Sequence, residues 1–93
     1  MSYILRTTKK FGKAVKLCIR RKYPMEELRQ VMSILVESGK LPPSYRPHKL
    51  KGIKGNCTWE CHILPDWLLV WEQHEDKLVM LMLDTGTHSD LFG

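Results

Sequence analysis

The stretch that decides the fold is Trp67-Leu-Leu-Val-Trp71. All five residues are apolar, so both faces of an extended segment here must be covered, which is typical of a central strand. Pro65 and Asp66 precede the run and predict a tight turn, and the polar stretch 72–76 follows it. We therefore expect residues 67–71 to form the middle of a sheet, with a sequence neighbour on each side.

The segments beyond these turns also have the patterns of strands. Polar and apolar residues alternate over 59–63, which puts Trp59, Cys61 and Ile63 on one face and Glu60 and His62 on the other. Residues 77–83 form another strand, Lys-Leu-Val-Met-Leu-Met-Leu. Because the connections are short, the three strands predict an antiparallel meander.

Two amphipathic helices are expected before the meander. A short strand at 3–6 comes first, and from Thr8 apolar residues recur at helical spacing. Pro24 suits the first position of a second helix, and Gly39 is available as its stop. The expected buried stripes are Phe11, Ala14, Val15, Cys18 and Ile19 in the first helix, and Leu28, Val31, Met32, Leu35 and Val36 in the second.

These elements predict an α+β fold in which an N-terminal strand and a helical hairpin pack on a mainly antiparallel sheet. Residues 41–47 contain three prolines and predict an extended linker that ends at His48. The 93 residues are expected to form one domain, 1–93.

Charge and cysteine content narrow the class of protein. There are 15 Lys and Arg against 10 Asp and Glu, and the net charge of +5 favours an anionic partner such as nucleic acid or an acidic protein. Three cysteines cannot form a complete set of disulfides, which indicates a reducing compartment. The first residues do not resemble a signal peptide, and no apolar run is long enough to span a bilayer. We expect a cytoplasmic protein without a membrane partner.

Four residues are candidates for acid–base chemistry: His48, His62, Asp66 and His88. The ends of adjacent strands meet in a meander, so His62, Asp66 and the post-strand His88 are expected to share one face, with the loop residue His48 nearby. The glycine turn before His88 lets the backbone aim its ring outward. Histidine beside a carboxylate can exchange protons near neutral pH.

Simpler interpretations remain open for each residue. In these interpretations His48 is only a loop residue, Asp66 is a turn cap, and His88 and Phe92 are parts of a solvated tail. His74 falls in a charged turn, where only solvation is expected. A zinc site of Cys57, Cys61, His62 and His48 has suitable ligand types, but Cys-x3-Cys-His lacks the usual CxxC spacing, and we expect no metal or other cofactor.

Four segments in the same order resemble one known family. They are Thr8-Lys-Lys-Phe-Gly-Lys13, Leu41-Pro-Pro-Ser-Tyr-Arg-Pro-His-Lys-Leu-Lys-Gly52, Glu60-Cys-His-Ile-Leu-Pro-Asp-Trp-Leu-Leu-Val-Trp71, and Thr85-Gly-Thr-His-Ser-Asp-Leu-Phe92. The chain resembles the YafQ-like branch of the RelE and ParE toxin superfamily, ribosome-dependent mRNA interferases of bacterial type II toxin–antitoxin modules. The resemblance covers nearly the whole chain.

The resemblance implies a RelE-like fold and cleavage of translated mRNA in the decoding site of the small ribosomal subunit. It also implies that His48, His62, Asp66 and His88 are catalytic. We expect His88 to be the acid, Asp66 or His62 the base, and His48 a positioning or proton-sharing partner. Trp67 and Phe92 match the aromatic residues expected at the site, and Phe92 is a candidate for stacking on an RNA base.

One residue departs from the family pattern. YafQ-like toxins commonly have arginine where this chain has Asp84, and a carboxylate repels phosphate. Lys49, Lys51 and Lys54 are candidates for supplying the missing cation to the RNA. Alternatively, Asp84 holds His88 in one tautomer.

The resemblance also implies the partners: a cognate antitoxin, the ribosome with its mRNA, and operator DNA only through the antitoxin complex. Two other functions remain possible. One is a non-catalytic toxin of the same fold that inhibits gyrase or the ribosome, and the other is a regulatory DNA-binding module that acts only with its antitoxin. Toxicity that survives loss of His62 and His88 would indicate the first, and harmless expression the second.

Overall fold

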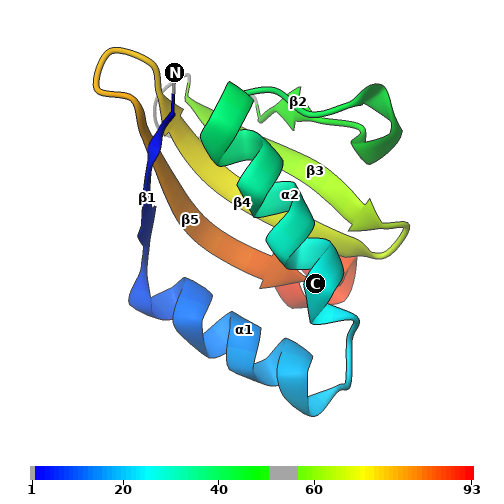
Figure 1. Cartoon of the computed structure of the whole chain (residues 1–93). Helices are drawn as coiled ribbons and strands as arrows, with labels where there is room; N and C mark the ends of the chain where they lie inside the picture. Colours follow the sequence, from blue (N-terminus) through cyan, green and yellow to red (C-terminus); the bar gives the residue numbers. More distant parts are fainter. Residues whose placement is uncertain (1, 51–56) are drawn as a thin grey trace.

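The computed structural model describes residues 2–50 and 57–93, which form two long helices, a five-stranded sheet and a short C-terminal helix (Figure 1). The predicted α+β class is confirmed. The elements are β1 (Ile4–Thr7), α1 (Lys9–Arg20), α2 (Met25–Ser38), the 3-10 turn η1 (Pro43–Tyr45), β2 (His48–Lys49), β3 (Thr58–Leu64), β4 (Trp67–His74), β5 (Val79–Gly86) and α3 (His88–Phe92).

The sheet has the strand order β1-β5-β4-β3-β2. The predicted meander is confirmed, because β3, β4 and β5 pair antiparallel in succession with β4 at the centre. β1 adds to the outer edge in parallel to β5, and β2 adds to the other edge antiparallel to β3. The prediction of His48 as a loop residue was therefore wrong: His48 is in an edge strand, opposite Glu60.

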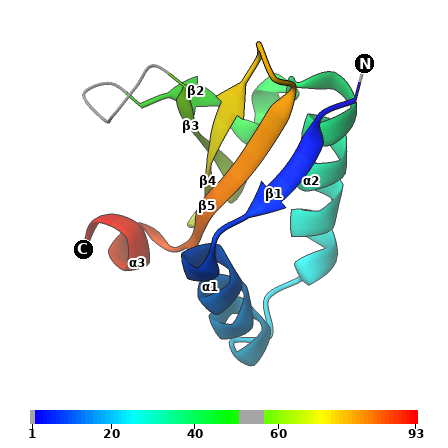
Figure 2. The same cartoon turned by 90° about the vertical axis from the view of Figure 1, so that its left-hand side faces the viewer.

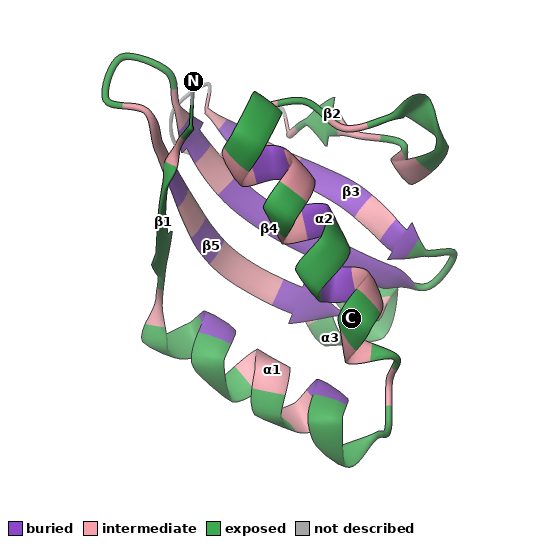
Figure 3. Ribbon diagram, in the orientation of Figure 1, coloured by how far each residue is buried: buried purple, intermediate pink, exposed green. Residues whose placement is uncertain are grey.

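Helices α1 and α2 build the core against one face of the sheet (Figure 1). Thr8 caps α1 by accepting a hydrogen bond from the Phe11 N–H, and Gly39 ends α2 in the left-handed conformation that glycine favours. Buried residues are concentrated on the central strands and on the inner side of α2 (Figure 3). The core cluster is Phe11, Cys18, Leu28, Val31, Leu35, Cys61, Ile63, Trp67, Leu69, Trp71, Met80 and Met82.

The first helix buries a narrower stripe than its periodicity predicted. Ile19 is 55% exposed, so its assignment to the buried stripe was wrong, and Val15 is only partly buried. In α2, Met32 likewise packs at the margin of the core. Periodicity identifies the side of the helix that faces the protein, but the sheet covers only the middle of that side.

The short helix α3 lies on the opposite side of the sheet from α2 (Figure 2). Gly86, with φ of 155°, ends β5 in a conformation that side chains disfavour, and a Cβ there would lie 2.7 Å from an Asp90 carboxylate oxygen. Thr87 and Asp90 then form a reciprocal capping box at the start of α3. The C-terminal residues are thus ordered by their own hydrogen bonds and are not a solvated tail.

Within the described residues, no helix has both the length and the apolar character needed to cross a membrane.

Candidate active site

His88 and Asp66 form the closest pair in the site. The Asp66 carboxylate oxygen Oδ1 lies 2.6 Å from His88 Nδ1 and 3.0 Å from the His88 backbone nitrogen, which donates to it. These hydrogen bonds from His88 lower the pKa of Asp66 below its ordinary value. Asp66 is thus a carboxylate that fixes the orientation of the His88 ring, and it leaves His88 Nε2 directed elsewhere.

His62 is the neighbour of His88. Their ring centroids lie 5.6 Å apart, although His62 comes from β3 and His88 from α3. His62 Nδ1 lies 3.2 Å from the Pro65 carbonyl oxygen, which can only accept a hydrogen bond. This contact places the proton of the neutral ring on Nδ1, so Nε2 carries the lone pair that a general base needs.

His48 is tied to Glu60, a residue that the sequence interpretation did not single out. His48 Nε2 lies 3.2 Å from Glu60 Oε1, and Nδ1 lies 3.1 Å from the Arg46 carbonyl oxygen. The Arg46 carbonyl oxygen can only accept a hydrogen bond, so His48 Nδ1 donates to it while Nε2 faces Glu60. Glu60 is 6% exposed and its Oε2 has no hydrogen-bond partner in the described structure. The alternation over 59–63 had already placed Glu60 on the same face as His62. That shared face was the feature of the sequence that could have identified Glu60 as a site residue.

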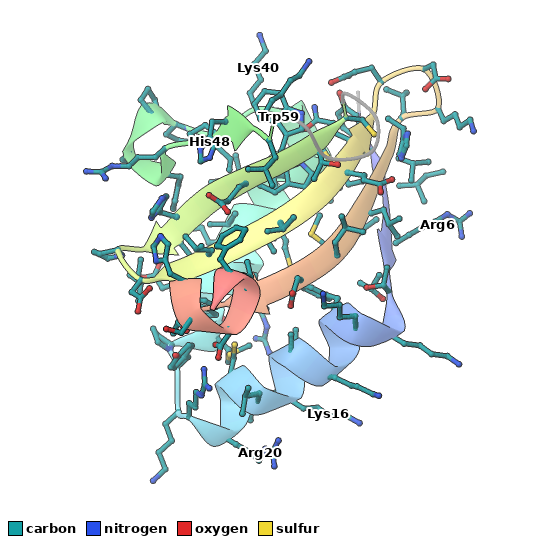
Figure 4. All side chains as sticks on the ribbon, turned by 180° about the vertical axis from the view of Figure 1, so that it is seen from behind. Arg6, Lys16, Arg20, Lys40, His48 and Trp59 are labelled. Atoms are coloured by element: carbon teal, nitrogen blue, oxygen red, sulfur yellow. The ribbon has the colours of Figure 1, made fainter. Side chains whose placement is uncertain are left out.

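The structure therefore brings His62, Asp66 and His88 together and places His48 on the same sheet face, opposite Glu60. His48, Glu60 and His62 share this face because they alternate with core residues or pair across β2 and β3. The side chains of His48, His88 and Asp66 are 49%, 54% and 68% exposed, so the cluster is open to a large substrate. Figure 4 shows His48 at the edge of the sheet, on the side from which α3 is seen.

The prediction that Trp67 contacts RNA was wrong. Its side chain is 2% exposed, packs edge-on against Tyr23 and donates a hydrogen bond of 2.9 Å to Thr85 Oγ1. Thr85 Oγ1 donates in turn to the Leu68 carbonyl oxygen. Trp67 thus joins β4 to β5 beneath the site and has no face available for stacking on a base.

Phe92 is the exposed aromatic residue of the site, with 61% of its surface accessible. It borders an apolar hollow of about 370 Å³ with Val70, Leu83 and Leu91. A smaller hollow of about 240 Å³ lies beside His62 and is lined by Arg46 and Ser44. The polar hollow thus adjoins His62, and the apolar hollow borders the helix that carries His88 through Leu91 and Phe92.

Lys49, one of the predicted lysines, does not supply the cation beside His48. Successive residues of a strand point to opposite faces, so Lys49 points away from His48, with Nζ 5.6 Å from the Trp59 ring centroid on the helix-covered side. Its assignment as a neighbour of the catalytic face was wrong. Lys51 and Lys54 lie outside the described residues.

Asp84 is paired with a lysine from helix α1. Its Oδ2 lies 3.4 Å from Lys10 Nζ, and its Oδ1 accepts the Thr85 N–H. The alternative in which Asp84 orients His88 was therefore wrong, because Asp66 has that position. Lys10 and Asp84 both border the apolar hollow beside Phe92. Lys10 is thus a cation beside the hollow that Phe92 borders.

The zinc ligand set that was considered from the sequence, and not expected, is incompatible with the fold. Cys61 is fully buried in the core under the helices, and burial raises the pKa of its thiol to about 12. His48 and His62 lie on the other face of the sheet, so these side chains cannot meet at one ion.

Helix α3 is held in place from the end of α1. Arg21 makes a two-pronged ion pair with Asp90, at 2.6 Å and 3.1 Å, and its guanidinium lowers the pKa of Asp90 to about 2. Because His88 begins α3, this pair also supports the catalytic position. The contact joins residues far apart in the chain, so no local pattern indicated it.

Replacing Arg21 with methionine should destabilise the protein in a pH-dependent way. A carboxylate with a lowered folded pKa stabilises the fold above its unfolded pKa of 3.8, and this stabilisation is lost as the pH falls toward about 2. Urea unfolding should show a lower midpoint for the variant at neutral pH, and the difference should shrink between about pH 4 and pH 2. Arg29→Met is the control, because its pair with Glu26 is largely exposed. A pH-independent difference would contradict this account.

Comparison with known families identifies this arrangement. Residues 3–93 match the family model described as the bacterial toxin of type II toxin–antitoxin systems, YafQ. The chain belongs to the YafQ family. It is 35% identical over 88 residues to the mRNA interferase toxin YafQ of Escherichia coli K12, a match that covers 89% of this chain and 88% of that protein. The predicted family and the predicted class of enzyme, an mRNA interferase, are thereby confirmed.

Solved structures of YafQ-like toxins share the whole fold. The E. coli DinJ–YafQ toxin–antitoxin complex contains a chain with a TM-score of 0.90 and 29% identity, with all of both chains covered. A metal-bound toxin from Helicobacter pylori has a TM-score of 0.88 and 33% identity, over 99% of this chain and all of that one. The predicted RelE-like architecture of the YafQ family is thus confirmed.

Proposed function

We propose that this YafQ-family toxin is a ribosome-dependent endoribonuclease that cleaves translated mRNA by metal-independent acid–base chemistry. The observation that carries the proposal is the His62–His88 pair, with ring centroids 5.6 Å apart and each Nδ1 engaged by an acceptor. The pair leaves two Nε2 atoms, one suited to take a proton and one to give it.

The residues divide the reaction between them. His62 Nε2 takes the proton of the ribose 2′-hydroxyl, and the O2′ attacks the adjacent phosphorus. The bond from phosphorus to O5′ then breaks while protonated His88 gives its Nε2 proton to the departing oxygen. Asp66 stabilises the positive charge on His88 before the transfer. The products are a 2′,3′-cyclic phosphate and a 5′-hydroxyl.

The charge that develops on the phosphorane is opposed by cations around the pair. His48, held between Glu60 and the Arg46 carbonyl oxygen, is the one within the cluster. Arg46 borders the hollow beside His62, and Lys10 borders the one beside Phe92. These groups take the place of the arginine that the family commonly has at Asp84.

Phe92 is suited to hold a base next to the cleaved bond. Its exposed ring borders the apolar hollow, and it belongs to the same short helix as His88. Stacking of a base on an aromatic ring contributes roughly 1–3 kcal/mol in single-strand binders. One five-residue helix thus presents both the acid and the base-stacking ring.

The basic surface of α1 is suited to ribosomal RNA and to the antitoxin. The side chains of Lys9, Lys13, Lys16 and Arg20 in α1, and of Lys22 just after it, are exposed, and Figure 4 shows Lys16 and Arg20 projecting from the helix. Phosphate contacts by such residues orient a protein without reading sequence. The DinJ–YafQ complex of E. coli supports an antitoxin as a partner of this protein. Operator DNA would be bound only through the antitoxin complex, in the cytoplasm.

Cleavage of ribosome-bound mRNA with and without ribosomes tests the proposal. We expect discrete cuts in mRNA on programmed ribosomes, with 2′,3′-cyclic phosphate ends, and little cleavage of the same RNA alone. A His62→Gln, His88→Gln double variant is the negative control. Equal cleavage of free RNA would contradict ribosome dependence. Toxicity that survives in the double variant would instead support a non-catalytic toxin.

A further inference from the structure

Cys57, Glu72 and His74 bring three metal-binding groups together at one corner of the sheet. The thiol sulfur, a carboxylate oxygen and an imidazole nitrogen all lie within 4.8 Å of one another. His74 Nε2 is 2.9 Å from Glu72 Oε1, and these side chains are 33% and 29% exposed. The cluster is thus partly buried and still accessible from solvent.

Strand pairing holds the three residues in place. Glu72 and His74 are two residues apart on β4 and so project from the same face. Glu72 pairs with Thr58, and the Gln73 N–H donates a 2.9 Å hydrogen bond to the Cys57 carbonyl oxygen. The ligand atoms are therefore positioned by backbone hydrogen bonds, as binding of a small ion requires.

The corner is separate from the histidine cluster. Leu68 pairs with His62, and Glu72 comes four residues later on β4. At about 3.3 Å per residue this places the corner roughly 13 Å along the strand from His62. None of its three residues belongs to the acid–base machinery.

We propose that Cys57, Glu72 and His74 bind a zinc ion. A thiolate, an imidazole and a carboxylate are all ligands of Zn²⁺, whereas Mg²⁺ and Ca²⁺ take oxygen ligands. The thiolate and carboxylate together neutralise the charge of the ion. Three protein ligands leave the fourth tetrahedral position to water.

The ion would act as a clamp between β3 and β4. Cys57 directly precedes β3, and the two metal ligands of β4 lie near the end of that strand. β3 also pairs with β2, which holds His48. Zinc binding would therefore stabilise the edge of the sheet that carries His48 without entering the reaction.

Cobalt titration of the untagged full-length chain, after removal of metal, tests the site. Co²⁺ bound in place of Zn²⁺ should produce a thiolate-to-metal charge-transfer band, and Zn²⁺ should displace it. Cys57→Ser should abolish the band. His74→Gln should weaken Zn²⁺ binding, measured against a chromophoric chelator, by more than roughly 100-fold, beyond the range of outer-shell substitutions.

Variants elsewhere distinguish this site from other metal-binding groups. His62→Gln and Cys18→Ser should leave both the band and the zinc affinity unchanged, and circular dichroism should show that each variant is folded. Absence of the band in the wild-type chain would overturn the proposal. So would a band that persists in Cys57→Ser, or zinc binding that is lost in His62→Gln. The result does not depend on whether the protein cleaves RNA.

Discussion

Replacing His88 with glutamine should slow cleavage of ribosome-bound mRNA by about 10²–10⁴-fold, the usual contribution of a general acid. Glutamine cannot give a proton to the departing O5′. Its amide can still approach Asp66, whose Oδ1 contacts both Nδ1 and the backbone nitrogen of His88. The measurement is single-turnover cleavage of a labelled mRNA on programmed ribosomes, with enzyme in excess.

Ser89→Ala is the matched control for His88→Gln. Ser89 is the next residue of α3 and is exposed. This control should retain cleavage within a few-fold, and binding to the ribosome should be similar for both variants. Cleavage by His88→Gln at the wild-type rate would show that another group protonates the leaving oxygen.

Asp66→Asn should also reduce cleavage strongly, by roughly 10²–10⁴-fold, as when a carboxylate that orients a catalytic histidine becomes an amide. The amide removes the negative charge that lies 2.6 Å from His88 Nδ1. It can also turn its NH₂ group toward the ring and favour the wrong tautomer. Single-turnover cleavage measures the loss.

A second measurement separates positioning from general loss of structure. The ¹⁵N shifts of the His88 ring should report a proton on Nδ1 in the wild-type protein and a mixture of tautomers in Asp66→Asn. Asp76→Asn is the control, since Asp76 is an exposed residue of the β4–β5 turn. An unchanged His88 tautomer together with full cleavage would exclude the positioning role of Asp66.

The position of His62 shows how much of the site was predictable. Alternation over 59–63 put His62 opposite Cys61, and the structure has Cys61 in the core and His62 on the open face. Such alternation is a property of the extended backbone, so it needs no knowledge of the partner strand. The same rule put Glu60 on the face of His62, where the structure has it.

The errors concern residues whose surroundings come from distant parts of the chain. Trp67 was expected at the RNA, but Tyr23 and Thr85 cover it. Asp84 was considered as a partner of His88, but Lys10 from α1 reaches it instead. In both cases the residue type was compatible with either role. Contacts with residues from distant elements determined which role the residue has.

By itself, the sequence determined the order of the first strand, the two long helices and the meander, the central place of Trp67–Trp71 and the faces of residues 59–63. These follow from local periodicity and from the need to bury apolar surface. Only the tertiary structure decided that Asp66 holds His88, that Glu60 holds His48, and that Cys57 meets Glu72 and His74. Such contacts depend on strand register and on the placement of α3, which distant residues set together.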